Sequence, residues 1–291
     1  MGEKIVQANG VEICTETFGD PKDPAILLVM GATASMLRWE DEFCERLAAG
    51  GRFVIRFDNR DVGRSTTYDV GSVNYSVEDL ADDAVGVLDA YDIDKAHIVG
   101  ASMGGMITQQ VALRHPDRVL TITPIMSSPD ASGIAAAASG GEAASPLPMP
   151  SPEFMAKLLE AQLIDWNDEA AVVDSSVRGW EALAGSAHPF DEETARDISI
   201  KELKRANSYR SAFNHAFAVA NTPGWRERLS EITVPTLVIH GTEDPILPFP
   251  HGEAIAEGIP GAKMLILDGC GHEIPRPEWD KVVGAILEHT A

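Results

Sequence analysis

The feature that most constrains the fold of this chain is a series of short apolar runs that alternate with helical patterns. The run AILLVM, residues 25–30, has no polar residue, which is typical of a strand buried on both faces of a parallel sheet. Runs of the same character occupy residues 53–57, 96–101, 119–125, 236–240 and 263–267. Strands that alternate with helices predict an α/β fold with a mostly parallel central sheet and helices on both faces.

Other local signals complete this pattern. Residues 4–7 and 11–17 flank the turn signal Asn9-Gly10 and predict a hairpin at a sheet edge. The sequence SVED, which begins at Ser76, resembles a capping box with Asp in place of Glu. Apolar residues then follow at helical spacing, and residues 103–114 and 279–288 are also expected to be helical.

The alternation stops at about residue 128 and resumes at about residue 233. Residues 130–150 are rich in small residues, Gly and Pro, which is typical of a loop. Ser151 and Pro152 then predict the start of a helix, and two or three further helices are expected before residue 225. One side of the first helix would carry Phe154, Leu158 and Leu163.

An all-helical insertion between two strands of a parallel sheet indicates a cap, or lid, over the core. We therefore expect an α/β core domain formed by residues 1–127 and 226–291. The helical cap would comprise residues 128–225, inserted after the sixth core strand.

Charge and composition exclude several classes of partner. The chain has 45 acidic and 23 basic residues among 291, a formal net charge of -22. Such a surface repels phosphate backbones and anionic lipids, so neither nucleic acid nor an acidic membrane is an expected partner. No apolar run approaches the ~20 residues that span a bilayer. The expected partner is a small molecule, and both a monomer and a homodimer remain open.

The three cysteines, Cys14, Cys44 and Cys270, are far apart and odd in number. Their spacing argues against a disulfide framework and against a zinc site, and it favours a reducing compartment. The N-terminal residues MGEKIVQANG lack the apolar segment of a signal peptide. We therefore expect a cytoplasmic protein.

Residues 100–104, Gly-Ala-Ser-Met-Gly, match the pattern G-x-S-x-G of a nucleophile elbow, a sharp turn between a strand and a helix. The pattern often occurs by chance, but here a buried run precedes it and a helical pattern follows it. The hydroxyl of Ser102 would stand at a helix N-terminus, where the dipole favours negative charge. The alternative is that Ser102 only caps the helix. We predict that Ser102 is a nucleophile.

A serine nucleophile needs a histidine to accept its proton and a carboxylate to orient that histidine. Asp244 follows the strand at 236–240, and His272 follows the strand at 263–267. This order of Ser, acid and His is the one expected after such an elbow. Because parallel strands end at the same edge of a sheet, we predict that Ser102, Asp244 and His272 form a catalytic triad.

Other residues remain as alternatives for these roles. Glu243 is adjacent to the predicted acid, and Asp130 follows the sixth strand. His240 ends a strand, and we expect it to be a structural histidine. Cys270 is conceivable as a catalytic thiol, but a small buried residue in a turn is the preferred interpretation.

Acyl transfer also requires N–H donors for the negative oxygen that forms during the reaction. Met103 follows the nucleophile and would supply one donor. We assign the second to Ala32, in the small-residue loop after the strand at 25–30, with Gly31 as the alternative. Gly31, Met36 and Met126 are candidates for substrate binding, and core packing is an equally open interpretation for the methionines.

Motifs spread over most of the chain resemble the α/β-hydrolases, and more narrowly the aclacinomycin methylesterase-like serine esterases. They are LLVMGATAS, FDNRDVGRST, GASMGG, GTEDPI and GCGH. The resemblance implies the same triad and the same oxyanion donors, although relatives often have Gly where this chain has Ala32. In FDNRDVGRST, we interpret Asp58 and residues 60–64 as charged support for a loop below the site.

These features predict a carboxylic-ester hydrolase, with methyl esters among its candidate substrates, that uses neither a metal nor a cofactor. The substrate would be a small ester of apolar character. A lactonase, a C–C bond hydrolase and a cofactor-free perhydrolase use the same triad and remain alternatives. From a different class, a non-catalytic ligand receptor on this fold is a further alternative, although such receptors more often have a degraded triad.

Overall fold

The computed structural model describes residues 2–130, 146–161 and 163–291, in which eight strands form one sheet. The order across the sheet is β1-β2-β4-β3-β5-β6-β7-β8. The β1–β2 and β2–β4 pairs are antiparallel, and all other neighbours are parallel. The strands are β1 (Lys4–Ala8), β2 (Val11–Phe18), β3 (Ala25–Val29), β4 (Phe53–Phe57), β5 (Ala96–Ala101), β6 (Val119–Ile125), β7 (Leu237–Gly241) and β8 (Lys263–Leu267). The predicted strands and the α/β architecture are confirmed.

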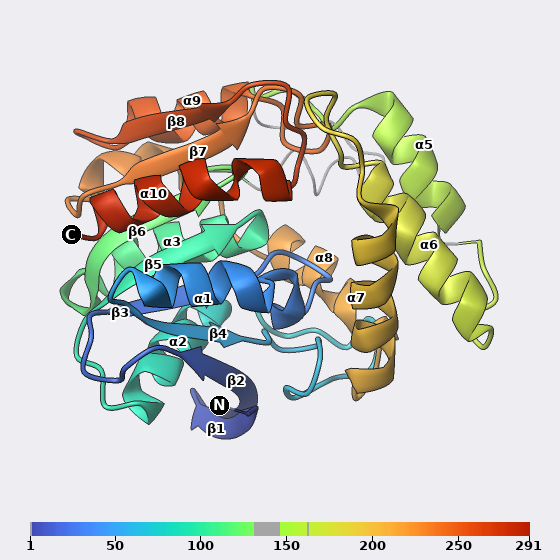
Figure 1. The fold of residues 1–291 in the computed structure, drawn as a ribbon, viewed down its shortest axis with the longest axis horizontal. Coiled ribbons are helices and arrows are strands. Elements are labelled where there is room, and N and C mark those ends of the chain that lie inside the picture. Colours follow the sequence, from blue (N-terminus) through green and yellow to red (C-terminus); the bar gives the residue numbers. More distant parts are fainter. Residues whose placement is uncertain (1, 131–145, 162) are drawn as a thin grey trace.

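Side chains alternate along each buried strand, so apolar side chains point to both faces of the sheet. Helices cover both faces. Leu27 and Val29 of β3 pack toward one face, together with apolar residues of α2 (Val77–Ala90) and α3 (Met103–Arg114). Ile26 and Leu28 pack toward the other, with residues of α1 (Asp41–Ala49) and α10 (Trp279–His289). In Figure 1, α1 and α10 lie in front of the sheet.

The sequence also encodes where these helices begin. At the start of α2, the Asp79 side chain accepts a hydrogen bond from the Ser76 N–H at 2.8 Å, so the predicted capping box is present. The Ser151 hydroxyl accepts from the Phe154 N–H at 3.1 Å, and α5 (Pro152–Ala161) begins there as predicted. Both helices begin at a hydroxyl side chain that satisfies N–H groups left unpaired at a helix start.

Between β6 and β7 the chain forms α5, α6 (Glu169–Glu181), α7 (Glu192–Arg205) and α8 (Asn214–Ala220). Figure 1 shows α5, α6 and α7 stacked beside one end of the sheet. One prediction in this segment is wrong: Leu163 lies beyond the end of α5 and is 85% exposed, because the chain leaves the helix before reaching it. The side chain of Leu158 and most of the predicted loop at 130–150 lie outside the described residues.

The parallel strands end at a common edge, where we look for a site. Their register aligns Val29 with Gly100, and Gly100 with Pro124. Gly241 is likewise opposite Leu267. Loops that follow β3, β5, β6, β7 and β8 therefore meet above this edge, next to the inserted helices.

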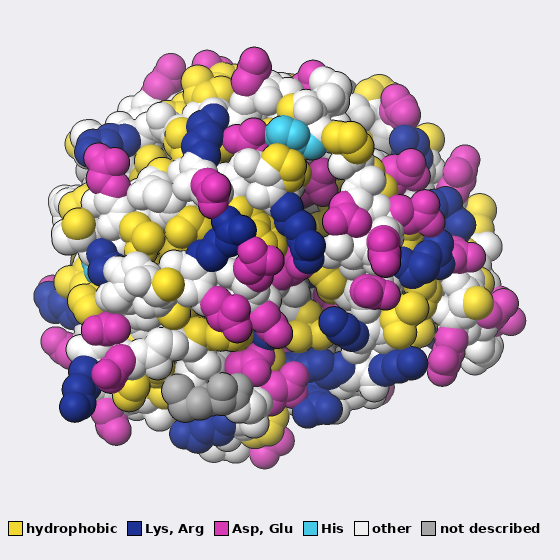
Figure 2. Space-filling model, viewed as in Figure 1, with side chains coloured by type: hydrophobic (Ala, Val, Ile, Leu, Met, Phe, Trp, Pro, Cys, Tyr) yellow, Lys and Arg dark blue, Asp and Glu magenta, His cyan; other side chains and the backbone are white. Residues whose placement is uncertain are grey.

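The surface and the cysteines agree with the composition. Figure 2 shows acidic side chains distributed over the whole viewed face, interspersed with Lys and Arg. Cys14, Cys44 and Cys270 are free and buried. None of the described helices combines the length and the apolar character needed to cross a bilayer.

Candidate active site

Ser102 occupies a strained turn between β5 and α3. Its φ of 55° and ψ of -120° are unusual for a residue with a side chain. Ser102 is the residue before the first turn of α3, yet its hydroxyl makes no capping hydrogen bond. The interpretation of Ser102 as a simple helix cap is therefore wrong. The backbone is forced into this turn while the hydroxyl is left available.

Close packing around the turn explains the glycines of the motif. A Cβ at Gly104 would lie 2.1 Å from the carbonyl oxygen of Val29, so α3 could not approach β3 as closely with any other residue. A Cβ at Gly31 would lie 2.9 Å from Ser102 Cβ and 3.5 Å from Ser102 Oγ. Gly31 thus leaves free the space beside the hydroxyl, as expected for a residue next to a bound substrate.

The predicted acid and histidine are in contact. His272 Nδ1 lies 2.6 Å from Asp244 Oδ2, and the side chain of Asp244 is fully buried. The other oxygen, Oδ1, accepts hydrogen bonds from the N–H groups of Ile246 and Leu247. Burial would raise the pKa of Asp244, but His272 and His240 beside it outweigh burial and lower that pKa below its usual range. Asp244 is therefore a fixed anion that orients His272.

The alternative acid Glu243 is engaged elsewhere. It is exposed, and its two carboxylate oxygens accept hydrogen bonds from Ser186 N–H and Ser186 Oγ, each at 2.8 Å. His240 donates from Nε2 to the carbonyl oxygen of Leu247 at 2.8 Å, with the same nitrogen 3.4 Å from Asp244. His240 is thus a buried structural histidine, as we predicted, and it lies beside Asp244.

The inserted segment holds the loop that carries His272. The His272 N–H donates to the carbonyl oxygen of Leu183 at 2.7 Å, and the Ala187 N–H donates to Gly269 at 2.9 Å. Within the described residues the Ser102 hydroxyl makes no hydrogen bond. In structures without bound substrate, catalytic hydrogen bonds are often long or poorly aligned.

Three backbone N–H groups of the loop after β3 already donate hydrogen bonds to side chains. Thr33 N–H donates to His215 Nδ1, Ser35 N–H donates to Glu202 Oε1, and Met36 N–H donates to Asp58 Oδ1. The N–H groups of Gly31 and Ala32 have no acceptor among the described residues. This pattern leaves the two candidate oxyanion donors available and favours neither over the other.

His215, from α8, was not predicted to hold this loop. Its Nε2 donates to the carbonyl oxygen of Arg60 at 2.7 Å, which leaves Nδ1 as the acceptor for Thr33. Burial lowers the pKa of His215 below its usual value and keeps the ring neutral, as this arrangement requires. Thr33 has a φ of 63°, which a β-branched residue rarely adopts. The hydrogen bond to His215 helps to hold it there.

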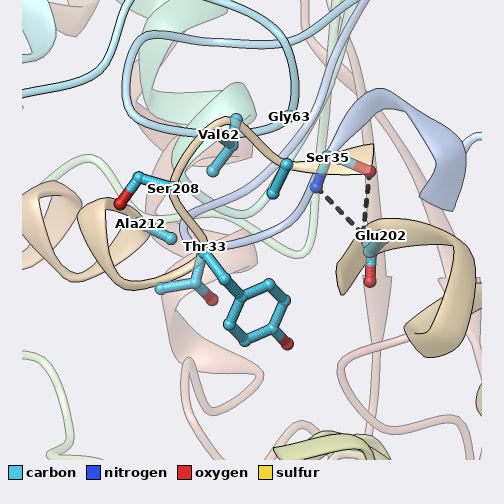
Figure 3. A pocket seen from close by; sticks show the side chains of 9 residues that line it. Thr33, Ser35, Val62, Gly63, Glu202, Ser208 and Ala212 are labelled. Atoms are coloured by element: carbon cyan, nitrogen blue, oxygen red, sulfur yellow. Dashed lines mark hydrogen bonds between the residues drawn. The ribbon is translucent and has the colours of Figure 1, made fainter. Parts of the chain in front are cut away.

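Glu202, from α7, is the second unpredicted support. Its Oε1 accepts from both the N–H and the hydroxyl of Ser35, and its Oε2 pairs with Arg38 at 2.7 Å. Figure 3 shows Ser35 and Glu202 at the wall of a cavity that Thr33 also lines. The cavity measures about 10 Å³, which is room for a single water at most, so it is no substrate site.

The remaining predicted residues are buried. Met126 packs in the core on the α1 and α10 side, and Met103 packs on the other side. Core packing is therefore the better interpretation for these two side chains, and Met36 is fully buried as well. Burial, followed by the charge of Glu278, raises the pKa of the Cys270 thiol to about 11. A thiol that stays protonated at neutral pH is a poor nucleophile.

The charged segment after β4 acts as the support that we predicted. Asp58 is buried, accepts from the N–H groups of Met36 and Arg64, and pairs with Arg205 of α7 at 2.7 Å. Arg60 forms a buried ion pair with Asp83 of α2. These contacts tie the loop after β3 to both the core and the inserted helices.

The family model for the alpha/beta hydrolase fold matches residues 24–275. The chain belongs to the α/β-hydrolase family. Among its relatives, a rhodomycin D methylesterase of Streptomyces sp. strain C5 is 35% identical, over 100% of this chain and 98% of that protein. A protein of the same name from Streptomyces peucetius is 34% identical with the same coverage. These relatives confirm the predicted resemblance to methylesterases.

Solved structures agree with the fold. An esterase from Exiguobacterium antarcticum has a TM-score of 0.77 at 22% identity, over 100% of this chain and 99% of that one. An enol-lactonase from Burkholderia xenovorans LB400 has a TM-score of 0.73 at 21% identity, over 98% and 99%. At these identities the likeness concerns the fold alone, and the reaction must be argued from the site.

Proposed function

We propose that this chain is a carboxylic-ester hydrolase in which Ser102, Asp244 and His272 form the catalytic triad. The observation that carries the proposal is a non-capping serine hydroxyl on a strained strand–helix turn, with a buried Asp–His pair on loops at the same sheet edge. The full-length similarity to two rhodomycin D methylesterases supports methyl esters as substrates. The net charge of -22 disfavours anionic substrates, which supports an uncharged ester.

In this mechanism His272 takes the proton of Ser102 as the hydroxyl oxygen attacks the ester carbonyl. The N–H groups of Met103 and Ala32, or of Gly31 in place of Ala32, stabilise the negative oxygen of the tetrahedral intermediate. His272 then gives its proton to the departing alcohol. Water, activated by the same histidine, attacks the acyl group on Ser102 and releases the acid. Asp244 stays ionised throughout and stabilises the imidazolium.

We further infer that residues 128–225 act as a cap whose described part completes this site rather than merely covering it. Leu183 accepts from the His272 backbone, while Glu202 and His215 accept from the loop after β3. The three free, buried cysteines support a reducing, cytoplasmic location.

The test is hydrolysis of p-nitrophenyl esters of graded acyl length, and of methyl esters, by the wild type and by Ser102→Ala. We expect the variant to lose at least about 10³-fold in kcat, with an unchanged circular dichroism spectrum. Turnover that survives in the variant would refute Ser102 as the nucleophile. Wild-type protein that binds esters or lactones without cleaving them would favour the alternative function of a non-catalytic ligand receptor.

A further inference from the structure

Three side chains that can ligate a metal converge beside the His272 loop, outside the proposed triad. They are His188, Cys270 and Glu278, and their ligand atoms all lie within 4.8 Å of one another. His188 Nε2 already lies 2.9 Å from Glu278 Oε1. The three come from three segments: the connection between α6 and α7, the loop after β8, and the short helix η5 (Arg276–Glu278) before α10.

The donor set suits a borderline-soft divalent cation. Imidazole nitrogen, thiolate sulfur and carboxylate oxygen are the ligands that Zn²⁺ uses in proteins, with water able to occupy a fourth position. Ligand atoms on one Zn²⁺ lie roughly 3–4 Å apart, so the cluster needs to contract by about an ångström or less. The side chains of His188 and Glu278 are 26% and 19% exposed, so they can make this adjustment and admit the ion from solvent.

Charge favours a cation at the same place. A Cys270 thiolate and the Glu278 carboxylate together supply two negative charges, which balance the ion. Glu273 and Asp268 also act on the thiol, and the positive group that opposes them is Lys281, whose Nζ lies 3.7 Å from Glu278 Oε2 and would have to swing away from the ion. Binding would convert the Cys270 thiol into a metal-bound thiolate and release its proton to solvent, while the proton shared by His188 and Glu278 moves to the other ring nitrogen.

We propose that His188, Cys270 and Glu278 form a zinc site that fastens the 182–191 connection to the loop of His272. Ala187 N–H already bonds to Gly269, and His272 N–H bonds to Leu183, so the metal would reinforce an existing contact. The site is separate from the ester chemistry, because the triad contacts described above involve none of its three side chains.

The experiment uses the full-length protein without a histidine tag. Titration with ZnCl₂ should give one bound ion per chain by calorimetry. At about 100 times the dissociation constant, Zn²⁺ should raise Tm by about 5 °C. Titration with Co²⁺ should give a near-ultraviolet thiolate-to-cobalt absorption band, which only a cysteine ligand produces.

Three variants locate the ion, and two controls test alternatives. Cys270→Ser should abolish the cobalt band, and His188→Gln and Glu278→Gln should each remove the Zn²⁺-induced rise in Tm. Glu273→Gln, a carboxylate on the same loop, and His272→Ala should retain it. A rise in Tm that persists in all three site variants, or a cobalt band that survives Cys270→Ser, would overturn the proposal. If Cys270→Ser does not fold, the Zn²⁺-induced rise in Tm of His188→Gln and Glu278→Gln still tests the proposal.

Discussion

At the scale of single residues, the environment separates two adjacent carboxylates. Asp244 is buried against His272, whereas Glu243 is exposed and bonded to Ser186. Asp244→Asn should therefore lower kcat by about 10⁴-fold, because the amide favours the wrong histidine tautomer. The matched variant Glu243→Gln should change kcat by less than about threefold, since an exposed hydrogen bond contributes little. Steady-state ester hydrolysis measures both, and the reverse ranking would transfer the role to Glu243.

The turn at Ser102 makes a second residue-scale prediction about stability. A non-glycine residue in a sparsely populated backbone region costs about 1–3 kcal/mol. Ser102→Gly should therefore be more stable than Ser102→Ala by an amount in that range, although both lack the nucleophile. Urea unfolding of the two variants provides the measurement. Equal stabilities would mean that the backbone at position 102 is not strained.

The three candidate triad residues could be selected from the sequence because each lies in or just after the turn that follows a recognisable buried strand. The side chains that hold the loop after β3 could not. His215 and Glu202 are 182 and 167 residues from their partners Thr33 and Ser35, and no local pattern marks either residue. Their roles depend on how the inserted helices dock, which a strand or helix pattern does not encode.

At the scale of elements, the ion pair between Glu202 of α7 and Arg38 of η1 (Met36–Arg38) joins the insertion to the core. Their side chains are only 7% and 6% exposed. Glu202→Leu should destabilise the protein by about 3–5 kcal/mol, because it leaves the Arg38 charge buried without its carboxylate and with only Ser199 Oγ as a hydrogen-bond acceptor. The double variant Arg38→Met/Glu202→Leu should recover much of that loss in denaturant unfolding.

Activity should respond differently from stability in these variants. The Ser35 N–H loses its acceptor in both, so ester turnover should stay low even where stability recovers. A double variant that regains full kcat would show that Glu202 does not position the loop after β3. The matched control is Arg46→Met/Asp280→Leu, an exposed pair whose removal should alter neither quantity appreciably.

The elements themselves were largely predictable. Continuous apolar runs identified the parallel strands, and hydroxyl residues marked the starts of α2 and α5. The prediction for Leu163 was wrong because helical spacing continues past Ala161, where α5 ends, and the spacing alone does not show that end. The spacing of the cysteines argued against a zinc site, and that prediction stays a prediction; the rule behind it considers only cysteines that are near one another in sequence. The fold instead brings one cysteine to a histidine and a glutamate from other segments.

At the scale of the whole molecule, the acidic surface opposes folding through self-repulsion. A net charge of -22 should make stability depend on salt. Raising NaCl from about 0.05 M to about 0.5 M shortens the screening length to a few ångströms, so Tm at pH 7 should rise by several degrees. Thermal unfolding followed by circular dichroism measures it. A fall in Tm would mean that the surface ion pairs outweigh the general repulsion.

The contacts between the inserted helices and the core bear on how substrate range could be exchanged between relatives. Leu183, Glu202 and His215 lie on the insertion, yet they hold the histidine loop and the loop after β3. A chimera that receives another enzyme's insertion therefore also receives another set of supports for its reacting groups. Such grafts should retain activity only when these three partners are transplanted with their matching loops, so recognition and chemistry are inherited here as one unit.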